Sequence, residues 1–242
     1  MLFSSEPKKG NSMKRYFTTA EIILWSTSVT LVLLSFMLFD RNGYLTLTAS
    51  LIGVTSLIFN AKGNPIGQVL MILFSILYGI ISYSFAYYGE MITYLGMTAP
   101  MAAVALISWL AHPYRGKRSQ VEVGRMAGKD WIPLLALTAA VTVIFYFILA
   151  YFHTANLIPS TVSVTTSFVA AYLTYRRSPY FALAYASNDI VLIVLWVMAS
   201  LANPTYIPVT VCFGVFLFND LYGYISWKKM GRAQGQNLSD KG

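Results

Sequence analysis

Long apolar runs, separated by short polar joints, fill most of the chain. The hydrocarbon core of a bilayer is about 30 Å thick and a helix rises about 1.5 Å per residue, so a spanning helix needs about 20 mostly apolar residues. Eight runs meet this requirement, and we expect a membrane helix in each: 20–39, 45–61, 66–87, 91–111, 132–152, 158–175, 180–202 and 206–227. The first is too long and too aromatic for a signal-peptide core. The pattern predicts an all-α integral membrane protein with eight transmembrane helices.

Composition supports this fold class. Apolar residues make up 57% of the 242 positions and charged residues only 11%, whereas soluble domains carry about 25% charged residues. An ordinary soluble domain is therefore excluded. The one cysteine, Cys212, excludes an intrachain disulfide, and with two histidines in the chain we expect no Cys/His metal site.

Positive charge lies almost entirely on one side of the predicted topology. If the N-terminus is cytoplasmic and every helix crosses once, 16 of the 17 Lys and Arg residues are cytoplasmic and Arg41 alone is external. This asymmetry follows the positive-inside rule. We therefore expect both termini in the cytoplasm, and the net charge of +8 needs no nucleic-acid partner to explain it.

Two parts of the chain resemble each other. Residues 49–65 align without a gap on 163–179, an offset of 114, and Ile107-Ser108-Trp109 matches Ile225-Ser226-Trp227 at an offset of 118. We predict two parallel three-helix units, 45–111 and 158–227, joined by a linker helix, 132–152. An extra N-terminal helix precedes this 3+1+3 bundle, and 228–242 forms a cytoplasmic tail. Parallel repeats of this kind occur in transporters, which bind substrate near mid-membrane between the halves.

Two polar pairs interrupt the apolar runs at mid-membrane depth: Asn188-Asp189 and Asn219-Asp220. Asp189 lies roughly 14 Å from the start of its run, and Asp220 lies about 12 Å from the basic end of the last one. A carboxylate at that depth costs on the order of 3 kcal/mol, so intramembrane acids usually face a polar interior. We interpret the pairs as parts of a substrate pocket. The alternative is that they hydrogen-bond other helices only for packing.

Aromatic and polar residues near these pairs complete the predicted pocket, and Tyr185, Asp189 and Trp196 share one helix face. The candidate substrate-binding residues are Tyr185, Asn188, Asp189, Trp196, Asn219, Asp220, Tyr222, Tyr224, Gln68, Tyr78, Tyr94 and Thr98.

Other residues have more ordinary interpretations. Pro100 is expected to kink its helix. Ser75, Gly79 and Ser82 suit close helix packing. Four aromatic residues near basic residues are typical of interfacial anchors: Trp109, Tyr114, Trp131 and Trp227.

The 3+1+3 plan, the prolines Pro65 and Pro179, and the helix endings Ser108-Trp109 and 222–227 (YGYISW) resemble the PnuC-type vitamin transporters over about residues 45–230. That family has a SWEET-like repeat fold and takes up nicotinamide riboside, with related members taking thiamine, riboflavin or nucleosides. The resemblance implies a multi-pass protein of a bacterial cytoplasmic (inner) membrane that depends on an intracellular kinase to trap the substrate. Asp189 lies where the family carries an aspartate, whereas Tyr185 stands where the family carries a tryptophan, which leaves the exact substrate open.

The leading hypothesis is facilitated diffusion of nicotinamide riboside by alternating access around a mid-membrane pocket. Proton-coupled symport through Asp189 or Asp220 is the alternative. An intramembrane enzyme would need a catalytic histidine or a metal at depth, but both histidines fall at predicted helix ends, so we expect no enzyme. We also expect no cofactor, and no ATP site is expected because the chain lacks a Walker-type glycine loop. Homo-oligomer formation is left open.

Overall fold

The computed structural model describes residues 16–84, 88–154 and 156–239, and eight helices in these ranges are long and apolar enough to cross a membrane. This confirms the predicted fold class. Five spans are single helices: α1 (Thr19–Phe39), α2 (Tyr44–Ala61), α3 (Ile66–Ser84), α7 (Leu157–Tyr175) and α8 (Phe181–Ala202). Three are composite. The first joins α4 (Tyr88–Thr93), the π-helical turn η1 (Tyr94–Thr98) and α5 (Ala99–Ala111); the second joins the 3-10 turn η2 (Gly128–Asp130) to α6 (Trp131–Tyr151); the third joins the 3-10 turn η3 (Pro204–Tyr206) to α9 (Ile207–Ser239).

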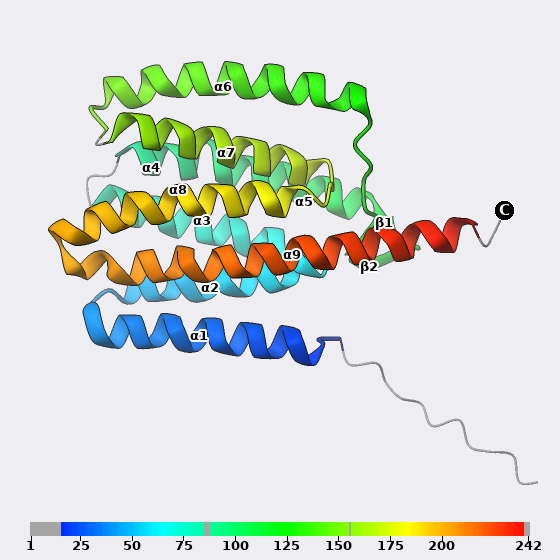
Figure 1. The fold of residues 1–242 in the computed structure, drawn as a ribbon, viewed down its shortest axis with the longest axis horizontal. Coiled ribbons are helices and arrows are strands. Elements are labelled where there is room, and N and C mark those ends of the chain that lie inside the picture. Colours follow the sequence, from blue (N-terminus) through cyan, green and yellow to red (C-terminus); the bar gives the residue numbers. More distant parts are fainter. Residues whose placement is uncertain (1–15, 85–87, 155, 240–242) are drawn as a thin grey trace, which may run out of the picture.

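The helices lie along one common axis, and six spans close into a ring (Figure 1). Around the ring, α2 contacts α3, α3 contacts α5, α5 contacts α7, α7 contacts α8, α8 contacts α9, and α9 returns to α2. The other two spans lie outside it: α1 packs on α2 and α9, and α6 packs on α7. In Figure 1 they form the lower and upper edges of the bundle.

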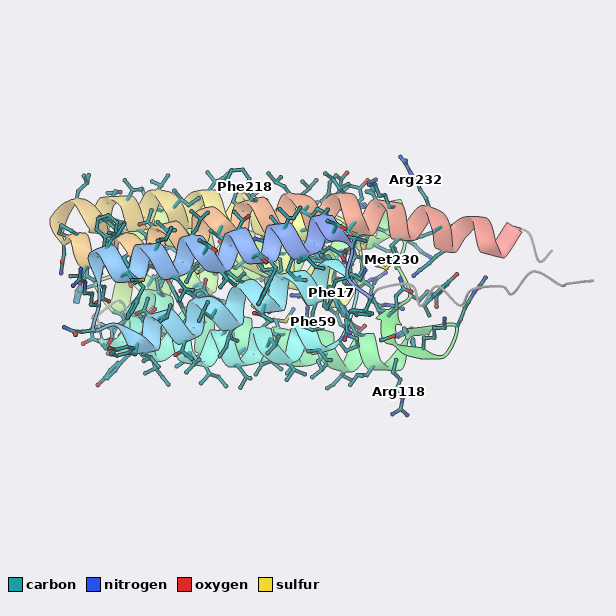
Figure 2. All side chains as sticks on the ribbon, turned by 90° about the horizontal axis from the view of Figure 1, so that it is seen from below. Phe17, Phe59, Arg118, Phe218, Met230 and Arg232 are labelled. Atoms are coloured by element: carbon teal, nitrogen blue, oxygen red, sulfur yellow. The ribbon has the colours of Figure 1, made fainter. Side chains whose placement is uncertain are left out.

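The outer surface of the bundle is apolar. Large hydrophobic side chains such as Leu38 on α1, Phe147 on α6 and Phe218 on α9 are exposed. Phe218 projects away from the bundle in Figure 2. A surface of this composition is suited to lipid rather than to water.

The joints α2–α3 and α7–α8 have the same conformation 114 residues apart. Gly63 (φ +65°) and Arg177 (φ +56°) both adopt the left-handed conformation, which costs a non-glycine residue about 1–2 kcal/mol. The next residue then donates its N–H to the carbonyl five residues earlier (Asn64 to Phe59 and Ser178 to Leu173, each 3.0 Å). These bonds satisfy carbonyls that the end of a helix leaves without intrahelical partners.

Two Ser-Trp pairs connect the three-helix units reciprocally. Ser108 and Trp109 of α5 donate to the end of α7, whereas Ser226 and Trp227 of α9 donate to the end of α2. The four bonds are Ser108 Oγ to Tyr175 O (2.8 Å), Trp109 Nε1 to Thr174 O (2.9 Å), Ser226 Oγ to Ala61 O (2.8 Å) and Trp227 Nε1 to Asn60 O (2.7 Å). The last helix of each unit thus holds the first helix of the other.

The interpretation of Trp109 and Trp227 as interfacial anchors is wrong. Both are 0% exposed, and their ring centroids lie 5.3 Å apart between the units. Adjacent basic residues suggested the membrane surface, but the indole N–H groups are needed by buried helix-end carbonyls. Trp131, in contrast, is exposed at the start of α6.

A short antiparallel hairpin follows α5, built from β1 (Pro113–Tyr114) and β2 (Lys117–Val121). Its two-residue turn, Arg115-Gly116, has positive φ at both positions, as type I′ hairpin turns require. At the end of β2 the Val121 N–H donates to Gly63 O, and three residues later the Gly124 N–H donates to Arg177 O, each at 2.9 Å. This segment therefore ties together the two matching joints. We call this part of the molecule the hairpin end, and the opposite part, with the joints 40–43 and 203–206, the far end.

The segment predicted as a tail, 228–242, is helical over the part that the structure describes. Helix α9 continues to Ser239 and runs past the other helices at the hairpin end (Figure 1). Gln234 accepts a hydrogen bond from the Val123 N–H (2.8 Å) and donates one to Val121 O (3.1 Å). Because the hairpin segment offers these backbone partners, the polar end of the helix has a surface on which to pack.

We expect Trp109→Phe and Trp227→Phe each to lower the thermal stability of the detergent-solubilised protein. Each change removes one hydrogen bond between the units and leaves a carbonyl short of a partner, a loss of about 1–3 kcal/mol. Thermal melting of the purified variants measures this. The exposed Trp131→Phe is the matched control, and a fall in melting temperature no larger than that of the control would contradict the predicted role.

Candidate functional site

A small cavity of about 30 Å³ lies inside the ring of six helices. Its polar lining comes from α8 (Tyr185, Asn188, Asp189), α9 (Asp220), the π-helical turn (Tyr94, Thr98) and α7 (Ser167). Its apolar lining comes from α2, α3 and α9 (Leu57, Met71, Phe74, Phe213 and Phe216). We call this the central cavity.

The two predicted carboxyl groups face each other in the central cavity. Asp189 follows the start of α8 by about 12 Å, and Asp220 precedes Lys228 by the same distance, so both lie at similar depth from the hairpin end. Asp189 is 3% and Asp220 5% exposed, and both side chains line the same small cavity. Among the described residues, Asp189 Oδ2 has no hydrogen-bond partner. An unpaired polar atom at this depth is available to a ligand.

The kink expected at Pro100 takes the form of the π-helical turn. Within it the Ala99 N–H bonds to the carbonyl of Tyr94, five residues back, instead of the usual four. Proline cannot donate a backbone hydrogen bond, and the wider turn accommodates it. The same turn brings Tyr94 and Thr98 to the cavity wall. The irregular backbone therefore helps to build the site.

Helix α7 fixes the orientation of Asn188. The side-chain oxygen of Asn188 accepts hydrogen bonds from Thr166 (2.9 Å) and Ser163 (3.2 Å). The hydroxyl-rich sequence of α7 thus supports the α8 side of the cavity. Ser167, one residue beyond Thr166, lines the cavity itself and was not among the sequence candidates.

Two candidates on α9 point toward α1 instead of the central cavity. Asn219 donates from Nδ2 to Ser28 Oγ (2.9 Å), and the Tyr222 hydroxyl donates to Glu21 Oε1 (3.2 Å). Asn219 is next to Asp220 in sequence, but a helix turns about 100° per residue, so neighbours face different partners. Neither side chain lines the central cavity in this conformation.

Two further candidates lie outside the central cavity. Gln68 donates from Nε2 to the side-chain oxygen of Asn60 (2.8 Å), which joins α3 to the end of α2. The ring of Tyr224 lies at the hairpin end, where Lys228 Nζ is 5.7 Å from its centroid. In this conformation both side chains contact neighbouring residues near the hairpin end and not the central cavity.

The remaining candidates, Tyr78 and Trp196, lie on the far-end side of the central cavity. Their ring centroids are 6.2 Å apart, and the ring of Tyr78 lies 4.3 Å from that of Tyr94. Trp196 lines a second cavity, described below, rather than the central one.

Phe213 and Phe216 are lining residues that sequence reasoning missed. They precede Asp220 by seven and four residues, so all three share one face of α9. This spacing in the sequence could have identified the two phenylalanines as lining residues. The prediction instead chose the aromatic residues nearest to Asp220 in sequence, Tyr222 and Tyr224, which lie closer to the hairpin end.

A wide cavity opens at the hairpin end, with a volume of about 1290 Å³. Five charged lining residues are basic and one is acidic: Arg115, Arg125, Arg177, Lys228 and Arg232 against Glu122. Partial burial lowers the pKa of the Arg177 guanidinium. Arg118 and Arg232 project outward at this end from opposite sides (Figure 2). The concentration of positive charge agrees with the asymmetry predicted from the sequence.

A family sequence profile described as nicotinamide mononucleotide transporter matches residues 43–229 of this chain. The chain belongs to this transporter family. The match begins just before α2 and ends just after Trp227, so it spans both three-helix units and the linker helix. Helix α1 and the last turns of α9 lie outside it.

Two similar proteins support the family assignment. A protein of Neisseria mucosa named nicotinamide riboside transporter PnuC is 28% identical over 205 residues, which cover 82% of this chain and 77% of that protein. A crystal structure described as the vitamin B3 transporter PnuC has the same fold, with a TM-score of 0.79 and 24% identity, and it covers 90% of this chain and 94% of that chain. The resemblance to PnuC-type transporters predicted from the sequence is confirmed.

Proposed function

We propose that this chain transports nicotinamide riboside by facilitated diffusion, with the central cavity as the binding site. The family membership and the name of the Neisseria relative support the substrate. The observation that carries the site is the buried pair Asp189 and Asp220, enclosed by aromatic rings at mid-membrane depth. The other two cavities described in this structure are each lined by one acidic residue, Glu122 or Glu90.

The chemistry of the cavity suits this substrate. Nicotinamide riboside joins a flat, positively charged pyridinium ring to a ribose with several hydroxyl groups. In the proposed complex the carboxyl pair balances the ring charge and accepts hydrogen bonds from ribose, as charged acceptors bind hydroxyls strongly. Tyr94, Tyr185 and Phe216 offer aromatic faces, which attract cationic rings.

Binding requires the cavity to open. Its volume of about 30 Å³ is far below the roughly 300–1,000 Å³ of pockets that hold small organic ligands. In the proposed mechanism, α2, α3 and the α4–α5 span move as one body, and α7, α8 and α9 move as the other. The 3+1+3 repeat, with α6 as linker, is supported by the matching joints and the reciprocal Ser-Trp bonds.

The proposed direction of transport is into the cytoplasm of a bacterium, across its inner membrane. We place the hairpin end on the cytoplasmic side because the basic residues gather there. Phosphorylation of the substrate by an intracellular kinase then keeps its free concentration low, so uptake runs downhill without a coupled ion.

Proton-coupled symport is the second candidate, and the placement of Asp189 and Asp220 in one buried cavity favours it. Two carboxyl groups that share a cavity can hold one proton between them, which relieves the repulsion of like charges. Carrying that proton across the membrane together with the bound substrate would couple the two fluxes.

We expect Asp189→Asn and Tyr185→Ala each to raise the Kd for nicotinamide riboside at least about tenfold, a loss of roughly 1.4 kcal/mol. Calorimetry on the purified protein measures this, with thiamine and riboflavin as comparison ligands. Asn219→Ala is the matched control, because Asn219 is equally buried but faces α1, and its Kd should stay unchanged. Unchanged affinity in both test variants would remove α8 from the binding site.

We expect uptake of nicotinamide riboside into proteoliposomes to be indifferent to an imposed proton gradient. Radiolabelled uptake with and without the gradient measures this. Faster uptake under the gradient, abolished by Asp189→Asn or Asp220→Asn, would instead establish symport through the acid pair.

We expect a membrane-impermeant maleimide to label Arg41→Cys, but not Arg118→Cys, in right-side-out spheroplasts. Arg41 lies in the far-end joint and Arg118 in the hairpin, and both are exposed. A Cys212→Ala background removes the native cysteine. Labelling of the Arg118→Cys variant alone would reverse the proposed orientation.

A further inference from the structure

A second cavity lies toward the far end of the bundle, with a volume of about 240 Å³. Its lining includes Glu90 of α4, Thr154 and Asn156 of the joint before α7, Ser160 of α7 and Trp196 of α8. Trp196 follows Asp189 by about 10 Å along α8, so this cavity lies beyond the central one. Its size approaches the lower end of the range for ligand pockets. We call it the outer cavity.

Glu90 is a buried acid whose charge nothing in the outer cavity balances. It is 7% exposed, and its Oε2 has no hydrogen-bond partner among the described residues. The described lining contains no Lys, Arg or His. Glu21, the other buried glutamate, differs because Lys62 pairs with it at 3.3 Å and Tyr222 donates to it. A carboxylate desolvated without a partner attracts a cation to its cavity.

Close packing holds Glu90 in this position. The preceding residue is Gly89, and a Cβ there would lie 2.6 Å from Thr154 Cγ2 and 2.8 Å from Leu149 Cδ2. The missing side chain therefore allows the start of α4 to lie directly against the end of α6 and the joint after it. The wall that carries Glu90 is a packed surface.

Trp196 connects the outer cavity to the central one. It forms part of the outer lining, and its ring is edge-on to Tyr78, with 6.2 Å between the centroids. Tyr78 in turn lies 4.3 Å from Tyr94, which lines the central cavity. A series of aromatic rings therefore runs between the two cavities, and aromatic faces attract cations.

We propose that the outer cavity is a second binding site, which takes a flat cationic heteroaromatic ring. The ring stacks on Trp196 and pairs with Glu90 before it passes along the aromatic series to the central cavity. This inference rests on the proposed function, because the pyridinium ring of nicotinamide riboside is a permanent cation. It goes further in making Glu90 a determinant of selectivity for charge, separate from the acid pair that binds the whole substrate.

The test compares a charged and an uncharged form of one substrate. Reduced (dihydro) nicotinamide riboside has nearly the same shape as nicotinamide riboside, but its ring is neutral. In proteoliposome uptake assays, Glu90→Gln should raise the half-saturation concentration for the cationic form about fivefold or more. The value for the neutral form should stay unchanged. Glu122→Gln removes the same charge at the hairpin end and should alter neither value.

Two results would overturn the outer site. Equal losses for the cationic and neutral forms would show that Glu90 supports the fold, and no loss for either would show that its charge has no role. If Glu90→Gln does not fold, Trp196→Phe replaces it as the test, because a smaller ring should weaken the cationic form alone; equal or absent losses overturn the site here too. Failure of the unmodified protein to take up nicotinamide riboside would instead overturn the proposed function, before any variant is compared.

Discussion

The need to place polar groups inside hydrocarbon governs this structure. Lipid offers no hydrogen bonds, so each carbonyl, hydroxyl and carboxyl group within the span needs a partner in the protein or a water-filled space. Several buried polar groups have such partners: Trp109 and Trp227 bond helix ends, and Asn188 bonds neighbouring hydroxyls. Asp189 Oδ2 and Glu90 Oε2 are among the buried atoms that lack partners in the described part of the chain. Both line cavities within the span, where a ligand can approach them.

The arrangement of bonds distinguishes the two ends of the bundle. At the hairpin end, Val121 at the end of β2 and Gly124 just after it bond to the two joints, and the two Ser-Trp pairs cross between the units nearby. Toward the far end, an open volume of about 240 Å³ separates α4 from α8. Hydrogen bonds between the units thus hold the hairpin end more firmly than the far end. In the proposed alternating-access cycle, a protein in this conformation would open first at the far end.

Helix positions and the depth of the acids could be predicted from the sequence because apolar run length and intramembrane charge are strong local signals. The directions of side chains could not. Asp220 and Asn219 look equivalent in sequence, yet one lines the cavity and the other bonds α1. Trp109 and Trp227 lie beside basic residues, but the partners that bury them come from helices far away in the chain. The C-terminal end of α9 likewise packs through hydrogen bonds between Gln234 and the backbone of Val121 and Val123. No local sequence pattern predicts these bonds, because the partners are 113 and 111 residues apart.

The central claim is that nicotinamide riboside binds between the two units at the acid pair. A structure of the protein bound to nicotinamide riboside tests it most directly. The account predicts a cavity wider than in the present conformation, with a ribose hydroxyl about 3 Å from a carboxylate oxygen of Asp189 and the pyridinium ring beside Tyr94 or Tyr185. A ligand bound only in the basic cavity at the hairpin end, away from Asp189 and Asp220, would contradict it.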